Sequence, residues 1–124
     1  MGTAIPFGMF DINDDKYKNT IEKINMMLRT YTGGYIRYEE DGYMGGYSPW
    51  PIATLWMSWY YFDAGIIEKA LETFNFVTNS ASGHGYIGEQ VNNDAMKPSW
   101  VIGLTWSHAM YLIMLDKLIK ENVL

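Results

Sequence analysis

The chain has 124 residues, of which 48% are hydrophobic, and it carries a formal net charge of −5 and no cysteine. This composition excludes a disordered chain, disulfide bonds and thiolate metal sites, and the lack of a basic stripe or a long apolar run argues against nucleic acid and membranes as partners. Because the opening residues lack the basic region of a signal peptide, we expect a single cytoplasmic domain over residues 1–124.

Residues 14–31 are predicted to form the first helix. Its apolar side chains recur at alternating spacings of four and three residues, the period of one helical face, at Tyr17, Ile21, Ile24, Leu28 and Tyr31. Gly33 and Gly34 follow as a stop signal, because glycine readily adopts the left-handed conformation found after many helices.

A second helix is predicted over residues 49–63, with Ser48 as its cap and Pro49 in its first turn. Between residues 50 and 62 it is apolar nearly all round and carries no charge, so it must be covered on every side. Large side chains point to different sides of this helix, at Trp56, Trp59, Tyr60 and Phe62. We expect that a single chain does not cover them all, and we therefore predict a homo-oligomer.

The third helix is predicted over residues 66–77, with one apolar face and one charged face. The fourth is predicted over residues 106–121, with Thr105 as its cap and a first half that is apolar almost all round. Amphipathic and fully apolar helices therefore alternate along the chain. Such alternation is expected when outer helices shield inner ones, so we predict an all-α fold of antiparallel helical hairpins.

The predicted connections alternate in length, with a short link at residues 63–65 and long ones at residues 32–48 and 78–105. If successive helices run antiparallel, both long connections emerge at the same end of the helices. Long connections within compact domains are often functional. We therefore expect residues of these two connections to converge on one site.

The second long connection carries a single carboxylate, Glu89, between aromatic-bearing segments. Aromatic rings suit the flat apolar faces of sugars, and cleavage of a glycosidic bond requires carboxyl groups. The simpler interpretation is a solvated glutamate beside a large aromatic core, since aromatic residues make up 16% of the chain.

The first long connection contributes Arg37, Asp41 and Trp50 as candidate functional residues. A guanidinium group presents a planar fork of donors that matches the neighbouring hydroxyl groups of a sugar. The alternative is that Arg37 and Asp41 form a salt bridge that pins the loop.

A metal site built from His84, Glu89, Asp94 and His108 lacks any recognised ligand spacing, so neither a metal nor another cofactor is expected. His108 is better interpreted as a core or loop-tethering histidine. Ser107 beside it does not form a catalytic pair with His108, because adjacent residues of a helix do not face each other.

Three segments, GGYIRYEEDGYMGGYSPWPIATLW, GYIGEQV and LTWSHAMYL, occur in an order and spacing that resemble the C-terminal part of the catalytic domain of glucoamylase- and glucodextranase-type enzymes, glycoside hydrolase family 15. The opening AIPFGMFDINDD resembles the segment that precedes them. The resemblance implies that residues 1–124 are a single partial catalytic domain, the last third of an (α/α)6 barrel. It also implies inverting hydrolysis of α-glucosidic bonds in starch- or dextran-like glucans.

The resemblance assigns individual roles as well. Glu89 matches the general base of the family, and Arg37 matches an arginine that contacts the substrate. Asp41, Trp50 and Trp106 match an acidic residue and two tryptophans beside the site. An α-glucan or oligosaccharide is the implied ligand.

The segment that carries the general acid of the family has no counterpart here, so the isolated chain is expected to be inactive or nearly so. A second copy of the chain or a complementing N-terminal half is then expected to complete the site. Two alternatives remain open: a non-catalytic glucan-binding module, and a structural remnant whose apolar helices drive oligomerisation.

Overall fold

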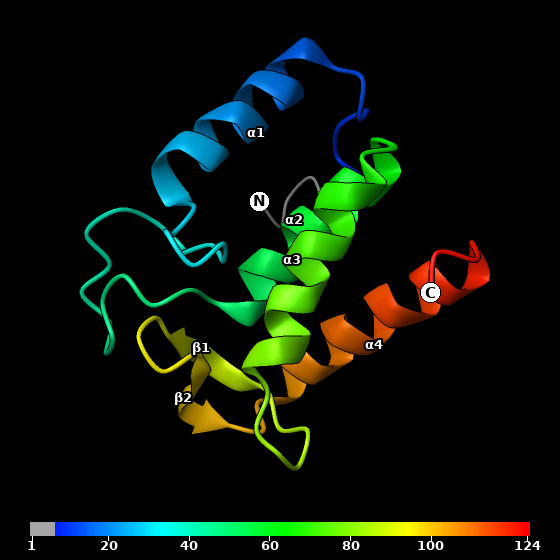
Figure 1. Ribbon diagram of the computed structural model, residues 1–124. Coiled ribbons are helices and arrows are strands. Elements are labelled where there is room, and N and C mark those ends of the chain that lie inside the picture. Colours follow the sequence, from blue (N-terminus) through cyan, green and yellow to red (C-terminus); the bar gives the residue numbers. More distant parts are fainter. Residues whose placement is uncertain (1–6) are drawn as a thin grey trace.

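The computed structural model describes residues 7–124, which form four helices and one two-stranded antiparallel sheet (Figure 1). The elements in chain order are α1 (Asp15–Leu28), α2 (Pro51–Asp63), α3 (Ile67–Ser80), β1 (Gly88–Asn92), β2 (Lys97–Ile102) and α4 (Thr105–Lys120). The first residues of the AIPFGMFDINDD segment lie outside the described part. No helix within residues 7–124 combines the length and apolarity needed to cross a membrane.

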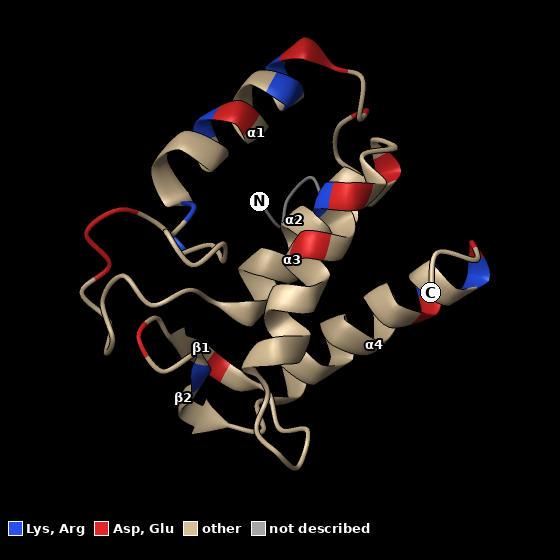
Figure 2. Ribbon diagram, viewed as in Figure 1, with Lys and Arg blue, Asp and Glu red and all other residues tan. Residues whose placement is uncertain are grey.

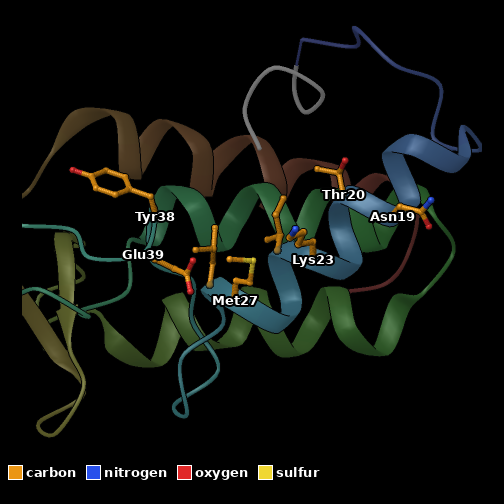
Figure 3. A pocket seen from close by; sticks show the side chains of 8 residues that line it. Asn19, Thr20, Lys23, Met27, Tyr38 and Glu39 are labelled. Carbon is orange, nitrogen blue, oxygen red and sulfur yellow. The ribbon is translucent and has the colours of Figure 1, made fainter.

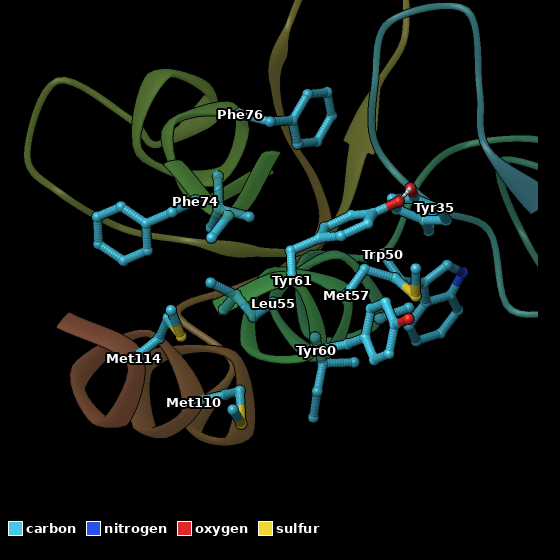
Figure 4. Close-up of a cluster of buried hydrophobic side chains, with 14 of the residues drawn as sticks. Tyr35, Trp50, Leu55, Met57, Tyr60, Tyr61, Phe74, Phe76, Met110 and Met114 are labelled. Carbon is cyan, nitrogen blue, oxygen red and sulfur yellow. Dashed lines mark hydrogen bonds between the residues drawn. The ribbon is translucent and has the colours of Figure 1, made fainter. Parts of the chain in front are cut away.

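The helical hairpins are confirmed, and α2 lies at their centre. It packs along α3, against α4 and against β1 (Figure 1). Its side chains form the middle of the aromatic and aliphatic core, together with Phe74 of α3 and Met110 and Met114 of α4 (Figure 4). Seven of the 20 aromatic residues are buried in this core and nine have exposed side chains, so the core accounts for only part of the aromatic content.

The chain itself covers α2, which contradicts the premise of the oligomer prediction. Nine of the 13 residues of this helix are buried. Trp59 and Phe62 are partly buried, and the Lys117 ammonium lies 5.2 Å and 5.0 Å from their ring centroids. The alkyl stem of a lysine shields apolar rings in this way while its charge stays in water.

The helix α4 leaves more of its apolar surface exposed than α2 does. This helix is buried along one stripe that includes Met110, Met114 and Leu118. Leu112 is 62% exposed and Ile119 is 53% exposed on its other sides. An apolar helix face of this kind is usually covered by a further element or partner.

The first helix ends three residues earlier than predicted, at Leu28. The Ile36 amide donates to the Leu28 carbonyl at 2.9 Å, and the Thr30 amide donates to the Gly34 carbonyl at 2.8 Å. The backbone therefore turns back on itself after α1. Gly33, with φ of 102°, shapes this turn and does not terminate the helix directly.

Both predicted helix caps were wrong. Ser48 lies in a turn, where its amide donates to the Gly45 carbonyl at 3.0 Å. The helix α2 begins at Pro51, whose missing N–H is no loss in the first turn. Thr105 is the first residue of α4 and not its cap, a position that Leu104 occupies.

The segment predicted as an irregular loop contains a hairpin, β1 and β2. Gln90 pairs with Ser99 and Asn92 pairs with Lys97. Between Gly88 and Gln90 the register shifts, which marks a β-bulge beside Glu89.

Gly34 lies where the turn after α1 crosses the core. A methyl group at this position would lie 2.6 Å from ring carbons of Phe76 and 2.6 Å from Cβ of Pro49. We expect Gly34→Ala to lower the free energy of unfolding by about 1–3 kcal/mol, because the core must shift to admit the methyl group. Urea denaturation followed by circular dichroism measures this.

The matched control is Gly83→Ala, since its methyl group would meet nothing within 4 Å. Equal urea midpoints for the two variants would show that the packing around Gly34 is looser than described.

Candidate functional site

The two long connections meet at one end of the helices, as expected from their alternation. The Tyr43 hydroxyl, in the first connection, donates to the Glu89 carboxylate at 2.8 Å. The Val91 amide donates to the Pro49 carbonyl at 2.9 Å, and the side-chain amide of Asn93 donates to the Tyr47 carbonyl at 2.9 Å. The Thr32 hydroxyl also donates to the Asn93 side chain at 2.7 Å, so several hydrogen bonds hold the hairpin against the first connection.

Glu89 lies on β1 and is the one charged residue of that strand (Figure 2). Its side chain is partly exposed. One carboxylate oxygen accepts the Tyr43 hydroxyl, and the other has no hydrogen-bond partner within residues 7–124. A carboxylate held at one oxygen and open at the other can accept a proton from a water molecule or a sugar hydroxyl.

Arg37 and Asp41 form the salt bridge that the sequence left as an alternative. Nε and a terminal nitrogen of Arg37 each donate to a different oxygen of Asp41, both at 2.8 Å. The Tyr43 amide donates to the same carboxylate at 3.0 Å. The Arg37 guanidinium holds the pKa of Asp41 at about 2, well below its usual value, and the Tyr43 amide adds to this.

Asp41 has a side chain that is only 1% exposed, whereas the side chain of Arg37 is 34% exposed. The carboxylate is thus occupied by protein donors and faces away from solvent. In this arrangement Asp41 holds Arg37 in place, and Arg37 is the residue of the pair that can reach a ligand.

Trp50 is the buried aromatic residue beneath Arg37. It is 1% exposed, and the Arg37 guanidinium carbon lies 4.0 Å from its ring centroid. The rings of Tyr43 and Trp106 lie 5.5 Å and 6.4 Å away. Trp50 therefore has no free face for a ligand, and its contribution to binding would be to support Arg37 from below.

Trp106, in the first turn of α4, is 48% exposed. It packs edge-on against Trp50, with an angle of 72° between the rings. Of the two tryptophans singled out in the sequence, Trp106 is the one with surface available to a sugar. The α4 helix thus brings an exposed aromatic ring to the side of the site that is formed by Arg37.

Two residues of the site were missed by the sequence analysis, Tyr43 and Trp100. Tyr43 lies in a glycine-rich segment that has no helical or strand periodicity. The sequence therefore did not predict its contact with Glu89. Trp100 lies on β2 at the bulge and has φ of 61°. A bulky residue in this left-handed region is strained by about 1–3 kcal/mol.

His108 tethers the hairpin to α4, as predicted. Its Nε2 accepts the Ile87 amide at 3.1 Å, so its Nδ1 carries the proton and donates to the Leu104 carbonyl at 3.0 Å. Both ring nitrogens are therefore in use. Within residues 7–124 no three His, Cys, Asp or Glu side chains are grouped so that they could hold a metal ion.

A hollow lies along α1, apart from Glu89 (Figure 3). This open groove of about 480 Å³ is lined by α1 side chains that include Ile24 and Met27, and by Tyr38 and Glu39 of the first connection. Its lining is largely apolar, which does not suit a sugar as well as the polar and aromatic surroundings of Glu89 do.

The sequence is similar to parts of known glycoside hydrolases. It is 35% identical over 126 aligned positions to an uncharacterized glycosyl hydrolase of Methanocaldococcus jannaschii, a match that covers 91% of this chain and 20% of that protein. It is also 30% identical to an isomaltose glucohydrolase of Kribbella flavida. That match covers 93% of this chain and 32% of the glucohydrolase. No protein-family model matches the sequence.

Solved structures agree with the sequence matches. Structures of glycosidase variants, one of them in complex with glucose, superpose with a TM-score of 0.81 at 26% to 28% identity. The match covers 92% of this chain and 33% of the glycosidase chain. The chain thus spans about a third or less of the length of the proteins it matches, and it has the fold of part of a helical-barrel glycosidase.

Proposed function

We propose that residues 1–124 are a partial catalytic domain, the last third of the (α/α)6 barrel of a glucoamylase-type enzyme of glycoside hydrolase family 15. Its ligand is an α-glucan or oligosaccharide, and Glu89 is the general base of an inverting hydrolysis. The observation that carries this proposal is the contact between Tyr43 and Glu89, which lies at the junction of the two long connections. The names of the relatives, an isomaltose glucohydrolase and a glucose-bound glycosidase, support the substrate class.

Glu89 would act through its open carboxylate oxygen. In an inverting reaction one carboxylate removes a proton from water as the water attacks the anomeric carbon, while a second carboxyl group protonates the leaving oxygen. The Tyr43 hydroxyl donates to the other oxygen of Glu89 and fixes the orientation of the carboxylate. The proton of the attacking water then passes to the open oxygen.

The general acid does not come from Asp41, one of three acidic residues of the first connection. Its pKa of about 2 keeps it ionised near neutral pH, and both of its oxygens accept protein hydrogen bonds. A group that donates a proton to a leaving oxygen must instead be protonated before the reaction. In the family that the sequence resembles, the general acid lies on earlier barrel hairpins, and we propose that here too it lies outside residues 1–124.

Arg37 and Trp106 would hold the sugar. The guanidinium lies over Trp50 and is fixed by Asp41, so little further side-chain entropy is lost when its remaining donors bind a sugar. Trp106 offers an exposed ring beside it. Asp41 and Trp50 contribute to binding through Arg37.

The exposed apolar face of α4 supports the need for further hairpins. In a closed barrel this face is covered by the neighbouring helices. Either the preceding part of a longer protein or a second copy of this chain would cover it. A glucan-binding module without catalysis is the second candidate function, favoured by the exposed ring of Trp106 and the partly exposed guanidinium of Arg37.

The experiment that tests the ligand class is calorimetric titration of the chain with maltotriose. We expect binding, and we expect Trp106→Ala to weaken it about tenfold through loss of aromatic contact. The control is Ile113→Ala, which removes another apolar side chain of α4 that is about equally exposed, at 49%. Equal affinities of the two variants for maltotriose would show that Trp106 does not contact the sugar. If the unsubstituted chain gives no heat of binding at millimolar maltotriose, the proposed ligand is wrong.

A further inference from the structure

Trp100 occupies a position of the hairpin where a large side chain is unfavourable. Between the pairs Gly88–Ile102 and Gln90–Ser99, the single residue Glu89 faces two residues of β2. Trp100 is the first of these two and adopts φ of 61°. Bulges with a left-handed first residue ordinarily carry glycine there, because glycine has no Cβ to clash. A tryptophan at this position is retained against a local conformational cost.

The indole of Trp100 reaches across to the first connection. A methyl group on Gly45 would lie 2.5 Å from Nε1 of Trp100, so the edge of the indole lies directly on the Gly45 backbone. Gly45 itself has φ of 88°, and it is two residues from Tyr43, which holds Glu89. Trp100 is thereby placed beside the same loop that orients the candidate base.

The indole remains available to a ligand. Trp100 is 43% exposed although its edge is packed against Gly45. Its strand, β2, pairs with β1, and β1 is the strand that packs against α2. Trp100 therefore lies on the second strand of the hairpin, where it faces Glu89 across the bulge, whereas Trp50 caps α2 and Trp106 lies in the first turn of α4.

We propose that Trp100 is a specificity-determining residue that binds a sugar ring of the glucan beyond the ring held by Arg37 and Trp106. The two exposed tryptophans, one on β2 and one on α4, would then contact different rings of a chain of several glucose units. Trp100 accordingly favours oligosaccharides over free glucose. This inference rests on the proposed function, because it presupposes a glucan in the site.

A purely structural role predicts a different outcome. If Trp100 only braced Gly45, its removal would disturb the Tyr43 loop and weaken every sugar alike. If it contacts a second ring, its removal weakens the oligosaccharide and leaves glucose unaffected. An aromatic replacement restores the sugar contact in the second case.

The test is calorimetric titration of the unsubstituted chain, Trp100→Ala and Trp100→Tyr with glucose and with maltotriose. We expect Trp100→Ala to weaken maltotriose binding about tenfold with glucose binding unchanged, and Trp100→Tyr to restore most of the maltotriose affinity. Trp59→Phe is the control for loss of an indole, because Trp59 lies near the end of α2, where it donates to Asp63.

Three outcomes overturn the inference. An equal loss for both sugars in Trp100→Ala assigns Trp100 a bracing role only, and no loss for either sugar removes it from the site. Both outcomes leave the proposed glucan site intact, because the unsubstituted chain still binds. Absence of binding of either sugar by the unsubstituted chain instead overturns the proposed function, and this inference with it.

Discussion

Asp41→Asn is expected to lower the free energy of unfolding by about 2 kcal/mol near neutral pH, because it removes the charge that pairs with Arg37 and spoils two charge-assisted hydrogen bonds. The carboxylate is nearly inaccessible, and its partner is held between it and the Trp50 ring. Arg37 would lose its fixed orientation in the same step. Urea denaturation measures the stability loss.

The loss should depend on pH in a defined direction. The folded pKa of Asp41, about 2, lies below the value of an unfolded aspartate, which is about 3.9. The ion pair therefore stabilises the fold fully above about pH 4, and this stabilisation is lost as the pH falls from about 4 toward 2. The unsubstituted chain and Asp41→Asn should then approach each other in stability at about pH 2.

Asp116→Asn is the matched control, since Asp116 pairs with Lys120 at 2.7 Å in a pair whose side chains are 61% and 70% exposed. Such surface pairs contribute about 0.5 kcal/mol or less. A difference between Asp41→Asn and the unsubstituted chain that stays constant from neutral to acidic pH would show that the charge of Asp41 is not what stabilises the loop.

The helices could be predicted from the sequence because their apolar residues follow a period that a single helix face imposes. The α2 helix was recognisable even without a polar face, since no charge interrupts it before Asp63, although its start was predicted at Pro49 and lies at Pro51. The side chains that cover α2 could not be predicted, because the packing of Lys117 over Trp59 depends on how α4 crosses α2. The same limit applied to the oligomer prediction.

The hairpin of β1 and β2 could not be predicted for a different reason. Pro98 interrupts the second strand, and a proline within an apolar run normally argues against a strand. The turn between β1 and β2 follows Asn92. The side-chain oxygen of Asn92 accepts hydrogen bonds from the amides of Asp94 and Ala95 at 3.0 Å and 2.8 Å. Both features look like an irregular loop in the sequence.

The location of the candidate site could be predicted from the sequence, but the burial of its individual aromatic side chains could not. Alternating connection lengths and the resemblance placed Glu89, Arg37 and Trp106 at one end of the helices. Which aromatic ring lies below and which lies on the surface depends on tertiary packing, so Trp50 and Trp106 looked equivalent. Local spacing alone did not indicate that Tyr43 would reach Glu89 across 46 residues of chain.

Glu89→Gln is expected to have the largest effect on activity. Glutamine preserves the size of the side chain but does not accept a proton from the attacking water, and loss of a general base lowers turnover by about a thousandfold. The effect can be measured only in a complete site. We therefore place the substitution in a chimera, in which this chain replaces the aligned segment of the Kribbella flavida isomaltose glucohydrolase. Glu68→Gln, on the exposed side of α3, is the control for loss of a carboxylate.

The most direct test of the account is glucose release from isomaltose and maltotriose by the chain alone, by the chimera, and by each with Glu89→Gln. We expect the unsubstituted chimera to release glucose, the Glu89→Gln chimera to do so about a thousandfold more slowly, and the chain alone to release none. Equal release by the two chimeras would contradict the assignment of Glu89 as the base. Release by the chain alone that disappears with Glu89→Gln would contradict the claim that the general acid lies outside these residues.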